Sequence, residues 1–492
     1  MNGFAPSNVF IVNNISDANK ALNFVRTIEW KETDGKILVY GATIQTYCCI
    51  ATLLEMKVLP QNIIFIEPFP PKDTKASRVS PFCNIYVDKT MREVLDNLNI
   101  KVNRSYYFKS WTLDCDDIVT NVQFMSLFKL IRLECAAFFY YGKRGVSEHT
   151  FMAVHKSGLA YDGGIVIDHN FQTNDRSIYA AGPVTRYHRR YYAATKRHKY
   201  YDTYEIGMKL GSLIRNQLDP LFTEKNKSRD YKENTSSDEF SSTNNSFKET
   251  ESSQELPFQS VPDFKKPIVK YCNLPGGLQY LEVRSPGMKV PHHYVQSLDY
   301  NGFVLETFKE GYFKMHFNKD FVVDGITCLT PEKYSLENFK KLYGLSSSVL
   351  NNVHLRYTTK KLDNLYEFFR EPWAHFLYHD QVDELFAIVK EILPKNQPHG
   401  QTLKEVLMAA ANGLPSTSLS YNMKLEIRSS FEKSPYINAI TEYVLQWVSE
   451  NDVLLPMYLQ PSERSAYAHD LNKNPAFKRR KRSIVKILAK IC

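Results

Sequence analysis

Apolar runs alternate with helical stretches along the first third of the chain. Read in order, they predict a strand at 36–41, a helix ending at Met56, a strand at 62–67, a helix at 88–98, and strands at 100–102 and 136–141. Strands and helices that alternate at this spacing build a doubly wound parallel sheet. We therefore predict an α/β fold with a Rossmann-like sheet, a degenerate form of the folds that bind FAD and NAD(P).

The pattern changes in the second half of the chain. Residues 223–262 are rich in Ser, Thr, Asn, Glu and Lys, a mixture that buries too little apolar surface to offset chain entropy. Beyond them, the alternation predicts strands at 278–283, 302–307, 312–317 and 321–328, and helices at 362–393 and 437–448. A second, more antiparallel α/β domain and a helical C-terminal region are expected.

The length of 492 residues favours two to four domains. Together with the extension, the linker and the basic segment, these elements divide the chain into six segments. They are an N-terminal extension (1–35), a Rossmann-like NAD-type domain with a flavin-motif remnant (36–183), a basic aromatic segment and helix (184–222), a disordered linker (223–263), an α/β interface-like domain (264–395), and a helical region with a basic tail (396–492).

Composition narrows the setting of the protein. The 62 Lys and Arg against 53 Asp and Glu leave a net charge of +9, which favours acidic partners without choosing among them. No run of apolar residues is long enough to cross a bilayer, and the N-terminus has no secretory signal. The eight cysteines are irregularly spaced, which is typical of a reducing compartment. We expect an intracellular protein that does not span a membrane.

The first strand-to-helix turn carries a damaged nucleotide signature. A dinucleotide fold uses Gly-x-Gly-x-x-Gly there, but only Gly41 remains, and Thr43 stands where a phosphate would approach. The candidate cofactor residues are Gly41, Thr43, Thr46 and Glu67, whose carboxylate falls where an acid would hold the adenosine ribose. If a cofactor binds, the Glu67 carboxylate favours NAD, because it would exclude the 2′-phosphate of NADP. The alternative to a dinucleotide site is an ordinary β-α-β unit that binds no cofactor.

Residues 163–168 and 173–183 resemble the flavin-ribityl motif of pyridine nucleotide-disulfide oxidoreductases. In that family an Asp follows the motif's final glycine and accepts a hydrogen bond from the ribityl chain. Here Ala181 and Gly182 are retained and are two further candidate cofactor-binding residues. Pro183, however, replaces the Asp and offers neither carboxylate nor N–H. Because only 35 residues precede the first predicted strand, we do not expect this chain to complete a flavin site by itself.

Other chemical candidates are weaker. Cys48 and Cys49 are adjacent on a predicted helix and fit core packing better than a redox pair. His375 and His379 have the spacing of a zinc pair, but Phe376 stands where a zinc protease carries its general base. We predict no catalytic residue and no metal site.

Residues 186–199 interleave basic and aromatic side chains without an acid. A solvated face, an acidic protein partner and nucleic acid are the three interpretations, in that order of preference. The candidate partner-binding residues are Arg186, Arg189, Arg190, Lys196 and Arg197. Residues 478–482 form a second basic cluster, which resembles a nuclear-import signal.

The chain also resembles the C-terminal region of the cilia- and flagella-associated protein 61 family between residues 21 and 393. The residues that carry the resemblance are 40–43, 47–49, 173–175, 180–183, 189–192, 274–277, 350–352, 370–374 and 379–380. Members of that family carry a long N-terminal region with an acetyltransferase-like part. This chain begins just before the Rossmann turn, so we expect a short paralogue or part of a longer protein.

The resemblance implies a structural component of the motile cilium or flagellum, in the calmodulin- and spoke-associated complex at the base of radial spokes. The flavoprotein-like region would then be a catalytically inactive scaffold without a cofactor, located in the cytoplasm, cytoskeleton and axoneme. Its partners would be radial-spoke or other axonemal proteins, with calmodulin and tubulin as candidates, and neither a membrane nor nucleic acid. The alternatives are an NADH-linked FAD-dependent oxidoreductase and a nucleotide sensor.

Overall fold

A computed structural model describes residues 6–28, 30, 35–68, 81–142, 145–219, 260–288, 302–379, 381–394, 400–414 and 419–451. The chain forms two compact units. The first comprises Met1–Lys143, Val269–Arg284 and Pro291–Cys492, and the second comprises Arg144–Ile268 and Ser285–Val290. The predicted domain 36–183 differs from this division, because its last 40 or so residues pack into a separate core in the second unit.

The first unit begins with a five-stranded parallel sheet. Its order is β1 (Val9–Phe10), β8 (Ala137–Tyr141), β2 (Ile37–Gly41), β3 (Ile63–Glu67) and β4 (Lys101–Arg104). Strands β2 and β3 are buried at every position, which is why they read as continuous apolar runs. The predicted Rossmann-like α/β class is confirmed. Strand β1 belongs to this sheet, so the boundary predicted at residue 36 differs from the structure.

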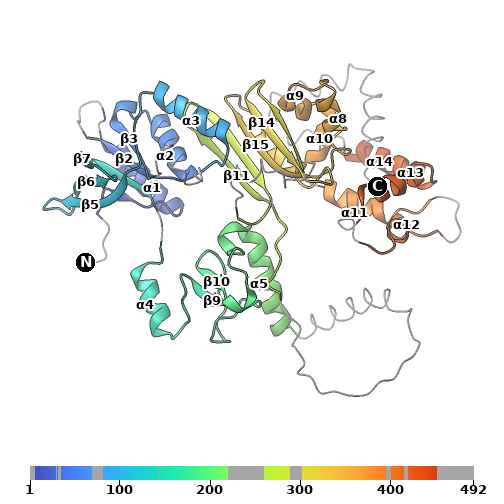
Figure 1. Ribbon diagram of the computed structural model, residues 1–492, viewed down its shortest axis with the longest axis horizontal. Coiled ribbons are helices and arrows are strands. Elements are labelled where there is room, and N and C mark those ends of the chain that lie inside the picture. The colour runs from blue at the N-terminus through green and yellow to red at the C-terminus, as the bar shows by residue number, and fades with distance from the viewer. Residues whose placement is uncertain are drawn as a thin grey trace. The chain divides into compact units, whose positions relative to one another are not determined.

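Both faces of this sheet are covered (Figure 1). Helices α1 (Ile15–Arg26), α2 (Ile44–Glu55) and α3 (Ile85–Asn97) share a core with Ile37 and Val39, and a single turn, η1 (Pro60–Asn62), leads into β3. The alternate residues Leu38 and Tyr40 face an antiparallel sheet of β5 (Tyr107–Leu113), β6 (Val119–Met125) and β7 (Leu130–Glu134). We call residues 6–142 the nucleotide-fold lobe.

The rest of the first unit is built on an antiparallel sheet, and we call it the antiparallel lobe. Its order is β11 (Ile268–Leu274), β12 (Leu278–Arg284), β15 (Val323–Thr330), β14 (Tyr312–Phe317) and β13 (Phe303–Thr307). Four of these strands match the predicted ones, and β11 is additional. Tyr280 and Tyr312 point into the helix-side core of the nucleotide-fold lobe, so the two lobes share buried apolar surface.

Helices cover the other face of the antiparallel sheet (Figure 1). They are η4 (Leu336–Leu342), α8 (Val353–Thr358), α9 (Leu365–Arg370), α10 (Pro372–His375), η5 (Phe376–Tyr378), α11 (Val382–Lys390), α12 (Leu403–Ala410), α13 (Tyr421–Phe431) and α14 (Tyr436–Asn451). One core runs from Leu281 to Trp447, so the boundary predicted at residue 395 lies inside it. The helix predicted for 362–393 is interrupted, because Glu371 before Pro372 is extended.

The second unit is small. It contains α4 (Glu148–Lys156), the parallel pair β9 (Ile165–Ile167) and β10 (Thr185–Tyr187), the single turns η2 (Arg189–Tyr191) and η3 (His198–Tyr200), and α5 (Thr203–Leu218). Its core includes Val261, so the last residues of the predicted linker 223–263 are folded. The linker up to residue 259 and the basic cluster 478–482 lie outside the described residues. Within the described residues, no helix has the length and apolar character of a membrane span.

Candidate functional site

The one glycine retained from the nucleotide signature has a packing role. Gly41 has φ +149°, a backbone conformation that residues with a side chain rarely adopt. A Cβ atom at this position would lie 2.6 Å from the carbonyl oxygen of Tyr141 on the neighbouring strand β8. The close approach of β8 therefore explains Gly41 without any bound phosphate.

The start of helix α2 is closed by two threonine side chains. Thr43 is the N-cap in an extended conformation, and Thr46 is fully buried in the first turn. The Thr43 backbone N–H donates to the Thr46 hydroxyl at 3.4 Å, and the two hydroxyl oxygens lie 3.3 Å apart. A phosphate bound at a helix N-terminus takes up such N–H groups. Here a capping box uses one of them internally.

The carboxylate expected to hold a ribose is committed to an ion pair. The Glu67 side chain is only 4% exposed at the end of β3, and its Oε2 lies 3.4 Å from Nε of Arg104. The parallel register of β3 and β4 places these two residues directly beside each other. To reach Glu67, a ribose would have to displace the half-exposed Arg104 from it. The buried carboxylate would then lose the positive charge that compensates it.

The flavin-motif residues belong to the second unit. The other candidate cofactor residues, Gly41, Thr43, Thr46 and Glu67, belong to the first. The Gly182 backbone N–H donates to Nδ1 of His198 at 3.0 Å, and Ala181 packs against the small core of that unit. The hydroxyl of Thr185 donates to the Gly182 carbonyl at 2.7 Å. Both backbone groups of Gly182 are thus used within the protein.

His198 is the centre of this arrangement and is 1% exposed. Because Nδ1 accepts from Gly182, the proton of the neutral ring is assigned to Nε2, which lies 2.9 Å from the Tyr187 hydroxyl. The ring also packs against Phe171 and Phe264, with centroids 5.5 and 5.8 Å away. Burial lowers the pKa of His198 to about 4. The residue was missed in the sequence because nothing local marks it as buried.

The basic segment receives counter-charges from outside its own sequence. Asp162 pairs with both Arg186 (3.1 Å) and Arg189 (3.0 Å), and Asp263 pairs with Lys196 (3.3 Å). The hydrogen bond from Arg189 and the charge of Arg186 lower the pKa of Asp162.

Two of the five candidate basic residues remain without a carboxylate within 4 Å in the described part of the chain, namely Arg190 and Arg197. The Arg190 guanidinium lies 4.8 Å from the Tyr191 ring centroid and donates to its hydroxyl at 2.7 Å. Tyr192 beside them is 87% exposed. The surface available to an acidic partner is therefore narrower than the sequence predicted.

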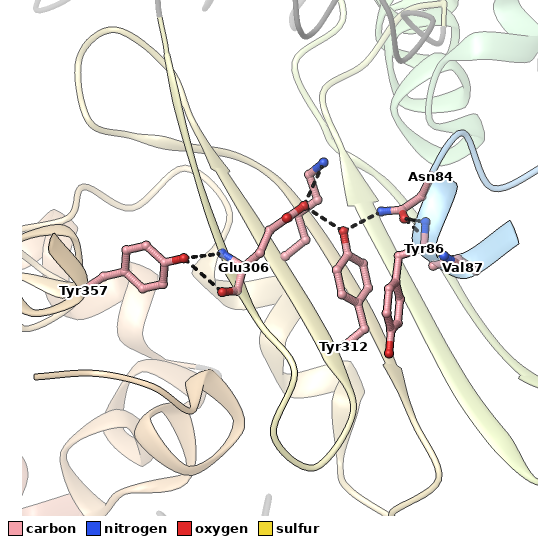
Figure 2. A network of polar contacts seen from close by, with 7 residues as sticks. Asn84, Tyr86, Val87, Glu306, Tyr312 and Tyr357 are labelled. Atoms are coloured by element: carbon pink, nitrogen blue, oxygen red, sulfur yellow. Dashed lines mark hydrogen bonds and ion pairs between the residues drawn. The ribbon is translucent and has the colours of Figure 1, made fainter. Parts of the chain in front are cut away.

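A cavity of about 430 Å³ lies where α3 meets β13 and β14. Figure 2 shows the polar chain along its wall. The amide nitrogen of Asn84 donates to the Tyr312 hydroxyl at 2.9 Å, and that hydroxyl donates to Glu306 Oε1 at 2.9 Å. Lys314, which is 9% exposed, lies 3.2 Å from the same carboxylate oxygen.

Tyr357 contacts the backbone of Glu306 at the same wall (Figure 2). Its hydroxyl donates to the Glu306 carbonyl at 3.0 Å and accepts from the Glu306 N–H at 3.4 Å. Tyr86 stacks on Tyr312 with ring centroids 4.5 Å apart. None of these residues was predicted from the sequence, although Asn84 before a helical run is an N-cap signal. The charges and hydroxyls pair with one another, so the network joins α3 to the antiparallel sheet.

The cysteines are free thiols in the described residues. Burial raises the pKa of Cys49 to about 12, and Cys48 packs beside the same core. The Cys48 thiol lies within hydrogen-bonding reach of Cys272 on β11, a neighbour that the sequence could not reveal. His379 is fully buried against Trp447, with ring centroids 5.2 Å apart. No group of three or more described His, Cys, Asp and Glu residues is arranged to hold a metal ion.

Sheet order and layering define an α/β protein with a Rossmann-like parallel sheet, an antiparallel α/β lobe and a helical C-terminal region. Residues 262–377 match the family model of the CFAP61 dimerisation domain. The chain is also 24% identical over 329 residues to cilia- and flagella-associated protein 61 of Tetrahymena thermophila. The predicted resemblance to the cilia- and flagella-associated protein 61 family is confirmed by these two matches.

That match covers 65% of this chain but only 18% of the Tetrahymena protein. Solved structures with a similar arrangement include an FAD-dependent pyridine nucleotide-disulphide oxidoreductase from Desulfovibrio vulgaris, at 14% identity and TM-score 0.41, covering 72% of this chain and 71% of that one. Another is reduced Bacillus anthracis CoADR-RHD, at 14% identity and TM-score 0.42, covering 78% and 61%. A third is the putidaredoxin reductase-putidaredoxin complex, at 12% identity and TM-score 0.37, covering 66% and 60%.

Proposed function

We propose that this protein is a structural component of the motile cilium or flagellum, a catalytically inactive scaffold with a flavoprotein-like fold. Its relationship to cilia- and flagella-associated protein 61 supports the ciliary setting. The finer proposal places it in the axoneme, in the calmodulin- and spoke-associated complex at the base of radial spokes. The partners proposed are other axonemal proteins, with calmodulin and tubulin as candidates.

The observation that carries the scaffold proposal is the internal use of the groups that would bind a cofactor. Glu67 pairs with Arg104, and Thr46 takes an N–H of the α2 N-terminus. In the second unit, Gly182 donates its N–H to His198. Groups that already have buried partners gain little from a ligand, because binding must first break those contacts.

The surface around Arg190, Arg197 and Tyr192 is the proposed contact for an acidic protein. Tyr192 is 87% exposed and lies two residues from the exposed Arg190, and Tyr and Arg are the residue types enriched in interface hot spots. An acidic segment there would gain charge-assisted hydrogen bonds without displacing an existing ion pair.

Localisation of a fluorescently tagged chain in ciliated cells tests this proposal. We expect the signal along the axoneme after the ciliary membrane has been removed with detergent. The variant Arg190→Glu, Arg197→Glu should lower the retained signal, while Lys156→Glu, an exposed basic residue on α4 of the same unit, should leave it unchanged. Complete release of the wild-type chain with the soluble fraction would contradict the scaffold proposal.

A further inference from the structure

The turn between β6 and β7 presents two apolar side chains to solvent. Phe128 is 96% exposed and Leu127 is 82% exposed. The turn holding them is well bonded: the Ser126 N–H donates to the Lys129 carbonyl at 2.8 Å, and the Ser126 hydroxyl accepts from the N–H groups of Phe128 (3.3 Å) and Lys129 (3.2 Å). These side chains are therefore held outward by the backbone.

A row of three further apolar residues adjoins this turn. Tyr107, Met125 and Leu130 are direct cross-strand neighbours on β5, β6 and β7, and they are 49%, 49% and 51% exposed. They share the outer face of the antiparallel sheet, because the next row, with Phe124 at its centre, points into the core. We call these five residues, Tyr107, Met125, Leu127, Phe128 and Leu130, the hairpin surface.

The hairpin surface is apolar beyond what a solvated sheet needs. Five contiguous apolar side chains, each about half exposed or more, amount to roughly several hundred Å², the size of the largest patch on a typical monomer and a common mark of an interaction site. Tyr, Phe and Met are also the residue types that protein interfaces favour.

The charges nearest this surface are basic. Lys109, Lys129 and Arg132 are exposed beside it, whereas the exposed acids of the same sheet, Asp114, Asp116, Asp117 and Glu134, lie at the opposite end of its strands. Lys129 lies in the turn, whereas Arg132 follows Leu130 on the same face of β7. The basic rim thus accompanies both the turn and the apolar row, and complementary potentials favour an acidic partner.

We propose that the hairpin surface binds an amphipathic helix of a partner protein, whose apolar face is flanked by acidic residues. Such a helix can lie across the turn and the flat row of the sheet together, which matches the extent of the apolar surface. Insertion into a bilayer needs only the exposed turn residues Leu127 and Phe128, whereas the apolar row through Met125 offers a further surface that a protein partner can cover. This inference goes beyond the proposed function and holds whether or not the chain lies in an axoneme.

A labelled helical peptide serves as the probe partner. It is about 18 residues long, with leucines on one face and glutamates flanking them, and its counterpart has lysines in place of the glutamates. Binding to the full chain is measured by fluorescence anisotropy. We expect the acidic peptide to bind, and the double variant Leu127→Ser, Phe128→Ser to weaken it by at least about tenfold. Leu355→Ser, a 61% exposed leucine on α8, is the control and should change nothing.

The contribution of charge is tested with the double variant Lys129→Glu, Arg132→Glu. This variant should bind the acidic peptide more weakly and the lysine peptide more tightly than wild type does. The proposal is overturned by equal affinity for the two peptides, or by no binding of the acidic one. It is also overturned if the serine variant abolishes sedimentation with phosphatidylserine-containing vesicles, which indicates a membrane contact. Loss of a dimer in that variant would assign the surface to a second copy of the chain.

Discussion

Acidification should unfold the second unit before the first, because His198 is buried without its charge. Burial lowers the pKa of this imidazole from 6.5 to about 4. In the unfolded chain the ring takes up a proton near pH 6.5, whereas the folded protein takes it up only near pH 4. Between these values, protons bind preferentially to the unfolded state, so the stability contributed by the neutral histidine is present above pH 6.5 and is lost as the pH falls towards 4.

The size of the effect follows from that interval. Each pH unit in it is worth about 1.4 kcal/mol, so the free energy of unfolding of the second unit should fall by about 3 kcal/mol between pH 6.5 and 4. A loss of that size is a large fraction of the stability of a small domain. The result should be cooperative opening of the second unit while the first remains folded.

Hydrogen exchange measured by mass spectrometry separates the two units, with peptides from residues 160–219 reporting on the second. The four tryptophans, Trp30, Trp111, Trp373 and Trp447, all belong to the first unit, so their fluorescence reports on that unit. His198→Gln can still accept from Gly182 and donate to Tyr187, yet it does not titrate. In this variant, the hydrogen-exchange protection of the second unit should be lower than in wild type at neutral pH, but it should not change between neutral pH and pH 4.

His155→Gln, on the exposed face of α4, is the matched control and should follow the wild-type profile. Parallel loss of protection in wild type and His198→Gln between pH 6.5 and 4 would contradict this prediction, because the titrating group would then lie elsewhere.

Three further predictions concern single contacts. Gly41→Ala should lower the free energy of unfolding by about 1–3 kcal/mol in denaturant titrations, because the new Cβ would lie 2.6 Å from the Tyr141 carbonyl oxygen. Gly207→Ala is the control, because a Cβ at Gly207 in α5 would lie in open space and should not destabilise the protein. Equal effects of the two substitutions would contradict this prediction. Tyr312→Phe removes two hydrogen bonds and should cost about 1–3 kcal/mol by the same titration. Tyr86→Phe removes the hydroxyl of a side chain that is 38% exposed and should cost less. In timed alkylation read by mass spectrometry, the exposed Cys115 should react well before Cys49 and Cys135, because burial raises the pKa of both buried thiols to about 12; simultaneous labelling in a folded sample would be inconsistent with their burial.

The parts of the fold predicted from the sequence are those with a strong local pattern. Strands β2 and β3 are buried on both faces, so they stand out as apolar runs. Strands β5 to β7 were missed, because Lys109, Arg132 and the exposed apolar residues of the hairpin surface break the alternation that marks a half-buried strand. Strand β1 has only two residues, too few to give a periodic signal.

The candidate site was predictable as a set of residues but not as a set of contacts. Glu67 was found from its position at a strand end, but its partner Arg104 follows only from the pairing of β3 with β4. Asp162 and Asp263 likewise come to the basic segment from distant positions. His198 is isolated in a polar stretch of sequence, and its burial depends on Phe171 and Phe264 closing around it.

Calorimetric titration of the full chain with NADH and with FAD tests whether the nucleotide fold is retained as architecture without binding a nucleotide. With Glu67 paired to Arg104 and the α2 N-terminus capped by Thr46, we predict no saturable heat for either ligand, in wild type or in Glu67→Gln. Saturable binding of NADH that Glu67→Gln abolishes would contradict the account, because the buried carboxylate would then be available to a ribose.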